Sequence, residues 1–248
     1  MATSEPRAAT DVRVAAYWAG FFGCTPGQLT AAGTHVVPHA GLADYAGAYL
    51  FRRGEACIVS VPAPLLATVT AQLAGLPAAT SFDVARLRHV FGDAIERIVG
   101  PAWQGYTWAG NFRPVAHPGA RRLTGDDEPA LRALAATCGE QDWAHSGIGR
   151  PDQVVFGAFL GDMLVAAGMG EPRGAILLHI GIVTHPDYRG HGYGRGVVSV
   201  IAAYGFEVGL VPWYQTLAAN SPSIALARSL GFSRYAETLA VRLSHQNS

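Results

Sequence analysis

A short glycine-rich segment, residues 189–194 (RGHGYG), separates two apolar stretches of the sequence. The stretch before it, residues 176–183, predicts a strand, and the alanine-rich stretch after it, residues 197–206, predicts a helix. A glycine-rich turn at the start of a helix leaves backbone N–H groups without partners, and the helix dipole favours negative charge there. The segment therefore predicts a binding site for the phosphate groups of a cofactor.

The spacing of these glycines excludes two common phosphate-binding motifs. A dinucleotide-binding G-x-G-x-x-G motif needs a third glycine, but Arg195 and Val197 occupy the two positions where it would fall. A P-loop needs a lysine, and all 18 residues counted as Lys or Arg are arginines. The absence of lysine also excludes pyridoxal phosphate bound as a Schiff base.

A second motif follows nearer the C-terminus. It consists of Asn220-Ser221-Pro222-Ser223, then Ala225-Leu226-Ala227 and Leu230-Gly231-Phe232. Together with the pattern R-x-x-G-x-G at residues 189–194, this motif resembles the GNAT N-acetyltransferase superfamily, in which the first pattern binds the coenzyme A pyrophosphate. The resemblance extends from Arg121 to Leu243. It implies a GNAT acyltransferase fold, an α/β fold with a mixed sheet, and acetyl-CoA as the acyl donor.

The resemblance also implies where the acyl donor binds. Two central strands of the family diverge, and pantetheine pairs with the freed edge of the first strand, here at Ile182, Val183 and Thr184. One N–H group of this edge would face the thioester oxygen. The expected pyrophosphate contacts come from Arg189, Gly190, His191, Gly192, Tyr193, Gly194 and Arg195. Asn220 and Ser223 of the second motif complete the expected cofactor-binding residues.

In this family an amine attacks the thioester directly, and two protons must be handled. Many members place a tyrosine as general acid four residues before the glycine of L-G-F, where this chain has Ala227. Tyr235 is our candidate replacement, with Tyr214 and Ser223 as alternatives. His179, in the strand before the glycine-rich segment, is a candidate general base because the pKa of an unperturbed histidine is about 6.5. The alternative is a hydrogen-bonded histidine that points into the core or out of the sheet.

The segment 140–145 (EQDWAH) follows the first helix of the family-like region and lines the acceptor pocket in the family. Its acids, Glu140 and Asp142, are further catalytic candidates, and together with Trp143 and His145 they suit a cationic amine. The alternative is an exposed helix start with one buried tryptophan. The expected acceptor is the amine of a small molecule or peptide.

Composition limits the other partners. The chain has 18 acidic and 18 basic residues and a formal net charge of zero, which argues against nucleic-acid binding. Cys24, Cys57 and Cys138 have no C-x-x-C spacing, so neither a disulfide framework nor a thiolate zinc site is expected. His35 and His39 flank Pro38, which is unfavourable for a helical metal site, so no metal is expected.

The N-terminus has no apolar signal segment, and no apolar stretch reaches membrane length. We therefore expect a cytoplasmic protein with no membrane partner.

The pattern predicts two domains, one at residues 1–112 and a GNAT domain at residues 120–245. The first is a smaller mixed α/β domain, either a degenerate GNAT copy or an unrelated domain that shapes the substrate site or forms a homodimer. Its expected elements are helices at 11–22, 64–74 and 82–91 and strands at 35–38, 56–62, 95–99 and 104–108. The second should contain a helix ending at 138, a hairpin of 154–160 and 163–169, strands at 176–183, 213–217 and 235–243, and helices at 197–206 and from 223. The alternative to an enzyme is a catalytically impaired acyl-CoA-binding regulatory or interaction module.

Overall fold

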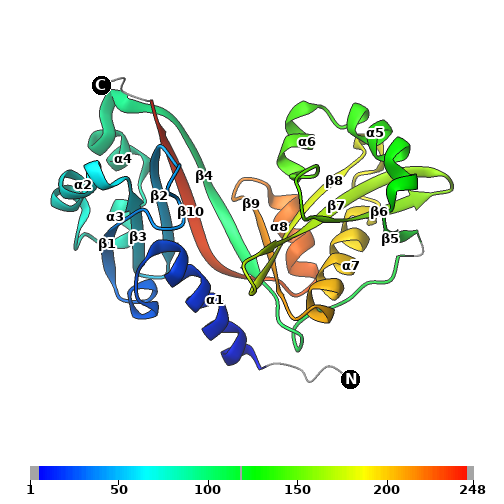
Figure 1. The fold of residues 1–248 in the computed structure, drawn as a ribbon, viewed down its shortest axis with the longest axis horizontal. Coiled ribbons are helices and arrows are strands. Elements are labelled where there is room, and N and C mark those ends of the chain that lie inside the picture. The colour runs from blue at the N-terminus through cyan, green and yellow to red at the C-terminus, as the bar shows by residue number, and fades with distance from the viewer. Residues whose placement is uncertain (1–5, 118, 245–248) are drawn as a thin grey trace. The chain divides into compact units, whose positions relative to one another are not determined.

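The computed structural model describes residues 6–117 and 119–244, which form a mixed α/β fold (Figure 1). Eight α-helices and ten strands are present in this described part. The strands form a mixed sheet in the order β1-β3-β2-β10-β4-β9-β8-β7-β6-β5, where β1 is Gly33–Pro38, β2 Gly47–Arg53, β3 Ala56–Val61, β4 Ile95–Tyr106, β5 Ala120–Arg122, β6 Val154–Leu160, β7 Met163–Arg173, β8 Leu177–Thr184, β9 Val211–Leu217 and β10 Ser233–Leu243. The helices are α1 Arg7–Phe22, α2 Leu66–Leu73, α3 Ala78–Ser81, α4 Val84–Phe91, α5 Glu128–Thr137, α6 Glu140–Ser146, α7 Tyr193–Glu207 and α8 Ser221–Ser229.

The chain divides into two compact units, each made of segments that are distant in sequence. The glycine-loop unit comprises the described residues up to Thr10, Gly105–Gln215 and Asn220–Ser233. The N-terminal unit comprises Asp11–Gln104, Thr216–Ala219 and the described residues from Arg234 onward.

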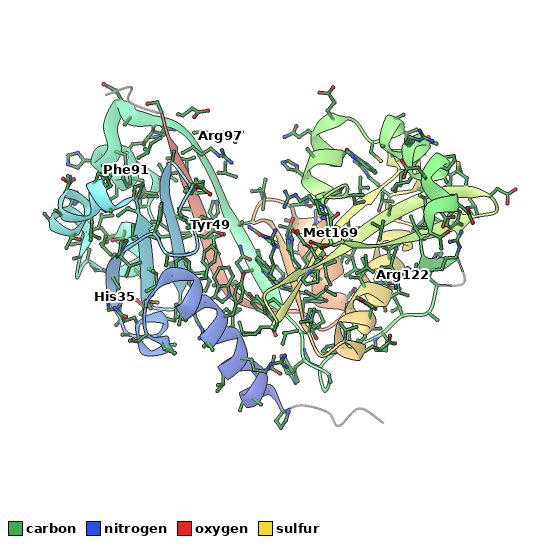
Figure 2. All side chains as sticks on the ribbon, in the orientation of Figure 1. His35, Tyr49, Phe91, Arg97, Arg122 and Met169 are labelled. Atoms are coloured by element: carbon green, nitrogen blue, oxygen red, sulfur yellow. The ribbon has the colours of Figure 1, made fainter. Side chains whose placement is uncertain are left out.

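The N-terminal unit has an apolar core between its sheet and short helices. All six residues of β3 are buried, as expected for a strand of nearly continuous apolar sequence. Val59 of β3 packs in one cluster with Leu73, Leu87 and Phe91 of the helices and Val241 of β10. Phe91 and Tyr49, the latter on β2, are labelled in Figure 2. This unit is therefore held together by residues from both ends of the chain.

Three features of the N-terminal unit differ from the sequence-based expectations. Strand β2 was not predicted, and β4 is one continuous strand where two were expected. β10 pairs antiparallel with β2, with Glu237 opposite Arg52, so the last strand lies in the N-terminal unit. The compact units thus interleave along the chain, whereas the boundaries at 1–112 and 120–245 stay a prediction for independently folding domains.

The glycine-loop unit has helices on both faces of its strands. β5 to β8 pair antiparallel, and β8 pairs parallel with β9. Val183 of β8 packs with Leu134 and Cys138 around α5, whereas Ile182 and Thr184, its neighbours in the strand, point to the opposite face near Gly194 of α7. Figure 1 shows α5 and α6 on one side of these strands and α7 on the other.

The order of strands and helices in this unit follows the expectation. The segment at 140–145, expected to follow the first helix as a loop or an exposed helix start, is the short helix α6. Among residues 6–117 and 119–244, no helix has the length and apolar character needed to cross a membrane.

Candidate functional site

Strands β8 and β9 separate partway along their length. Their ladder runs from Leu177 to Ile180 of β8, and its last pair is Ile180 with Tyr214. On its other side, β8 stays paired with β7 as far as Thr184. Residues Gly181–Thr184 therefore form an open edge on the side of β9. The backbone polar groups of such an edge can pair with an extended ligand.

The glycine loop, residues 189–194, leads into α7. Gly190 and Gly192 have φ angles of +80° and +88°, and a Cβ at either position would meet no atom within 4 Å. Positive φ favours glycine, and the open space leaves room for a ligand. The first bond of the helix runs from the Gly196 N–H to the Gly192 carbonyl oxygen, at 3.0 Å.

The backbone N–H groups of residues 190–195 are available for a ligand. Within the described part of the chain, none of them donates a hydrogen bond, and the N-cap residue Gly192 has no side chain to cap the helix. Unpaired N–H groups at the start of a 15-residue helix fit a phosphate or pyrophosphate group.

Gly194 brings the loop, the open edge and α8 together. A Cβ at this residue would lie 2.9 Å from Thr184 Oγ1, 3.6 Å from Leu226 Cδ1 and 3.7 Å from Ile182 Cγ1. A side chain at residue 194 would force the Thr184 side chain to shift, so the start of α7 lies close to β8. A ligand that binds the loop can therefore continue along the open edge.

Arg189 and Asp142, both named from the sequence, form an ion pair. Arg189 Nη2 donates to Asp142 Oδ2 at 2.7 Å, and Arg189 Nε donates to the Thr184 carbonyl oxygen at 3.3 Å. Both ion-pair side chains are about half exposed, at 53% and 50%. Glu140, at the start of α6, is also exposed. The structure thus links α6 to the glycine loop and to the end of the open edge.

The second motif forms the start of α8. Asn220 is its N-cap, and Asn220 Oδ1 accepts a hydrogen bond from the Ser223 N–H at 3.2 Å. Ser223 Oγ shares a 2.8 Å hydrogen bond with the hydroxyl of Tyr214, the last β9 residue paired with β8. Burial raises the pKa of Tyr214 to about 12, although the bond to Ser223 opposes the shift. A neutral phenol therefore lies beside the point where the strands separate, and its partner Ser223 is one helical turn before the fully buried Ala227.

His179 lies on the face of β8 that α5 and α6 cover. Its ring is 4.7 Å from the ring of Trp213, and its buried Nδ1 has no hydrogen-bond partner among the described residues. The nearest carboxylate oxygen, Glu171 Oε2, is 3.8 Å from Nδ1, too far for a hydrogen bond. Burial lowers the pKa of His179, while Glu171 opposes this shift. The imidazole is thus neutral at physiological pH and can accept a proton.

Glu171 was not identified from the sequence. Arg173 Nη2 lies 2.9 Å and Arg150 Nη1 3.7 Å from its Oε2 atom. His179 lowers the pKa of Glu171, burial opposes that effect, and Arg173 and Arg150 lower the pKa further. In the sequence, Glu171 is only a carboxylate close to an expected strand. Its position opposite His179 depends on the register between β7 and β8.

Met169, labelled in Figure 2, pairs with Gly181 across the same two strands. Its Cε atom would lie 2.9 Å from a Cβ at Gly181. The first residue of the open edge is therefore closely packed on the face of α6.

Tyr235 lies in β10 of the N-terminal unit. Its hydroxyl accepts a 2.8 Å hydrogen bond from Arg53 Nη1, and the Arg53 guanidinium lies 4.0 Å from the ring centroid. Burial raises the pKa of Tyr235 to about 12, and Arg53 opposes the shift. The structure thus assigns Tyr235 and the glycine loop to different units, and its catalytic role stays a prediction.

Among residues 6–117 and 119–244, no group of three or more His, Cys, Asp or Glu side chains is arranged to hold a metal ion. The features that fit a ligand are the glycine loop and the open edge.

Comparison with known proteins gives a family for part of the chain. Residues 120–232 match the family model described as Acetyltransferase (GNAT) family. No curated protein matches this sequence.

Solved structures extend the comparison. An acetyltransferase of the GNAT family from Colwellia psychrerythraea is similar over 98% of this chain and 99% of its own, with a TM-score of 0.55 and 13% identity. A protein of the GNAT family from Novosphingobium aromaticivorans has 26% identity over 60% of this chain and 67% of its own, with a TM-score of 0.48. A GCN5-related N-acetyltransferase from Kribbella flavida has 20% identity over 64% and 65%, with a TM-score of 0.46. The first of these shares the fold over nearly the whole chain.

Proposed function

With residues 120–232 identified as a GNAT acetyltransferase domain, we propose that the protein transfers the acetyl group of acetyl-CoA to an amine of a small molecule or peptide. The observation that carries this proposal is the combination of an open strand edge with unpaired N–H groups at the start of α7. The edge can pair with an extended chain, such as the pantetheine arm of coenzyme A. The loop can bind two linked phosphates, such as the pyrophosphate that joins this arm to the nucleoside.

The binding residues follow from that fit. The backbone of Ile182, Val183 and Thr184 would bind pantetheine along the open edge, and residues 190–195 would bind the pyrophosphate. Arg189 and Arg195 supply positive charge beside the loop. Asn220 fixes the first turn of α8 next to the same region.

The chemistry that acetyl-CoA supplies is an activated thioester carbonyl, which a neutral amine can attack without a covalent enzyme intermediate. A backbone N–H group of the open edge would stabilise the negative charge that develops on the carbonyl oxygen. Holding both reactants in this geometry removes much of the entropic barrier.

Proton transfer is assigned to two side chains of the glycine-loop unit. His179, kept neutral by burial, would accept the proton that the amine loses. Tyr214 would donate its hydroxyl proton to the departing sulfur, and the half-buried Ser223 would return a proton to it from water. Tyr235 and the carboxylates Glu140 and Asp142 stay alternative predictions, as do a homodimer and a cytoplasmic location.

One observation favours a second candidate function. Ala227 occupies the position of the usual family acid and is fully buried. A chain that binds acyl-CoA without turnover would be a catalytically impaired regulatory or interaction module.

Thiol release distinguishes the two functions. Purified protein is incubated with acetyl-CoA and a panel of primary amines, and free coenzyme A is measured with a thiol reagent. An enzyme releases thiol above the buffer rate with at least one amine. Binding of acetyl-CoA by calorimetry without thiol release from any amine would favour the module, and no binding at all would contradict both functions. NADH serves as the control ligand.

A further inference from the structure

The Arg189 side chain already donates to two acceptors, and neither of them lies in the glycine loop. One is the Asp142 carboxylate on α6, at 2.7 Å, and the other is the Thr184 carbonyl oxygen at the end of the open edge, at 3.3 Å. The positive charge of Arg189 is therefore paired with a carboxylate of a different element. A pyrophosphate bound at the loop would compete with that carboxylate for the same guanidinium.

The competition favours the pyrophosphate. Arg189 and Asp142 are each about half exposed, so water solvates both partners and their pairing contributes little. A pyrophosphate carries more charge than one carboxylate, and the unpaired N–H groups of residues 190–195 would hold it next to Arg189. When the pyrophosphate replaces Asp142, Arg189 loses a weak ion pair and gains a stronger contact with the phosphates.

The C-terminal end of α6 contacts the open edge, and its first turn is linked to the edge through Arg189. A Cβ at Gly181 would collide with the carbonyl oxygen of Ser146, which places the last turn of α6 against the first residue of the edge. At the other end, Arg189 connects Asp142 to Thr184, the last residue of the edge. A carboxylate released from Arg189 would consequently face a ligand bound on the α6 side of the edge.

We propose that the coenzyme A pyrophosphate displaces Asp142 from Arg189, and that the released Asp142 carboxylate then binds a positively charged group of the acceptor. The inference rests on the proposed function. The acceptor class is an amine with a second cationic group, because the attacking nitrogen must be neutral whereas the group held by Asp142 stays protonated. Coenzyme A binding should therefore strengthen acceptor binding, because the pyrophosphate frees Asp142 from Arg189.

Coenzyme A affinity tests the exchange. Calorimetric titrations with coenzyme A compare the wild type, Asp142→Asn and Glu128→Gln. Glu128 is a matched control because it forms an exposed ion pair with Arg132 on α5, at 3.7 Å, and its substitution changes the net charge equally. We expect Asp142→Asn to bind coenzyme A about two- to fivefold more tightly, as for removal of an exposed ion-pair competitor, and Glu128→Gln to bind as the wild type does.

The direction of the change in coenzyme A affinity tests the proposed exchange. Weaker binding by Asp142→Asn would mean that Asp142 orients Arg189 for the pyrophosphate, and equal binding would mean that Arg189 never leaves Asp142; either result overturns the exchange. In an Arg189→Gln background the added Asp142→Asn change should have no effect. If the wild type itself does not bind coenzyme A, the proposed function fails rather than the exchange alone.

Two probes that differ by one amine test the acceptor class. The coenzyme A complex of the wild type is titrated with 1,4-diaminobutane and with 1-aminobutane. We expect the diamine to bind about tenfold more tightly, equivalent to ~1.4 kcal/mol, and we expect Asp142→Asn to abolish the difference. No preference for the diamine, or a preference that survives Asp142→Asn, overturns the role of Asp142 in acceptor binding.

Discussion

Helix α4 of the N-terminal unit and helix α7 of the glycine-loop unit begin differently, and strands β3 and β8 differ in how their edges are paired. In the N-terminal unit, α4 is capped by Asp83, whose side chain accepts from the Arg86 N–H at 2.9 Å. In the glycine-loop unit, α7 begins at Gly192 with no side-chain cap. A helix start that serves only stability satisfies its own N–H groups, whereas one that binds an anion leaves them free.

The strands repeat this contrast. β3 pairs with β1 from Ala56 to Val61 and with β2 from Ala56 to Ser60, so both of its edges are used. β8 has a partner on only one edge after Ile180. Unpaired backbone N–H and C=O groups can bind a ligand, so the open edge of β8 and the loop before α7 support the proposed coenzyme A site.

The largest expected effect comes from a side chain that fills the space at the glycine loop. Gly192→Val should weaken acetyl-CoA binding by about 100-fold or more, equivalent to ~2.7 kcal/mol, because a branched residue disfavours the φ of +88° and fills the space for the phosphates. Calorimetry measures the affinity.

The matched control is Gly54→Val in the turn between β2 and β3. Gly54 has a φ of +58° and open space around it, so the backbone strain is similar. We expect this variant to lose stability and keep its acetyl-CoA affinity. Equal losses of affinity in both variants would mean that strain, not phosphate binding, explains the effect.

The next effect distinguishes Tyr214 from Tyr235. Tyr214→Phe should lower kcat roughly 100-fold, near the lower end for general acid catalysis because a thiolate leaves readily, with unchanged acetyl-CoA affinity. Tyr235→Phe in the N-terminal unit is the competing variant. A larger loss of kcat in Tyr235→Phe would transfer the role of proton donor to Tyr235.

A pH profile tests His179. Because the pKa of His179 is lowered, the base form predominates above the usual value of about 6.5. We expect kcat/KM to rise with pH, with a midpoint below about 6.5. Glu171→Gln should move the midpoint to lower pH, since it removes the charge that favours protonated His179. An unchanged midpoint in Glu171→Gln, or an unchanged profile in His179→Gln, would exclude His179 as the base.

The smallest effect is expected at the capped helix. Asp83→Ala should lower the free energy of unfolding by about 1 kcal/mol, measured by urea denaturation, and leave acetyl-CoA affinity unchanged. A change in affinity would mean that the N-terminal unit takes part in cofactor binding, contrary to the comparison of the two units.

Local spacing was sufficient to predict the glycine loop and the order of elements around it, because a strand, a turn and a helix of contiguous residues leave their signature in the sequence. It was not sufficient for β2, whose neighbour β10 comes from the opposite end of the chain. The pairing of Glu171 with His179 and of Arg189 with Asp142 likewise depends on register and packing. Such non-local contacts have no local periodicity from which they could be predicted.

Backbone amide hydrogen exchange, with and without acetyl-CoA, tests the central claim most directly. The account predicts slower exchange at residues 181–184 and 190–195 in the complex and unchanged exchange at residues 56–61 and 84–91 of the N-terminal unit. Saturating acetyl-CoA that leaves residues 190–195 unprotected, or that protects the N-terminal unit instead, would contradict it.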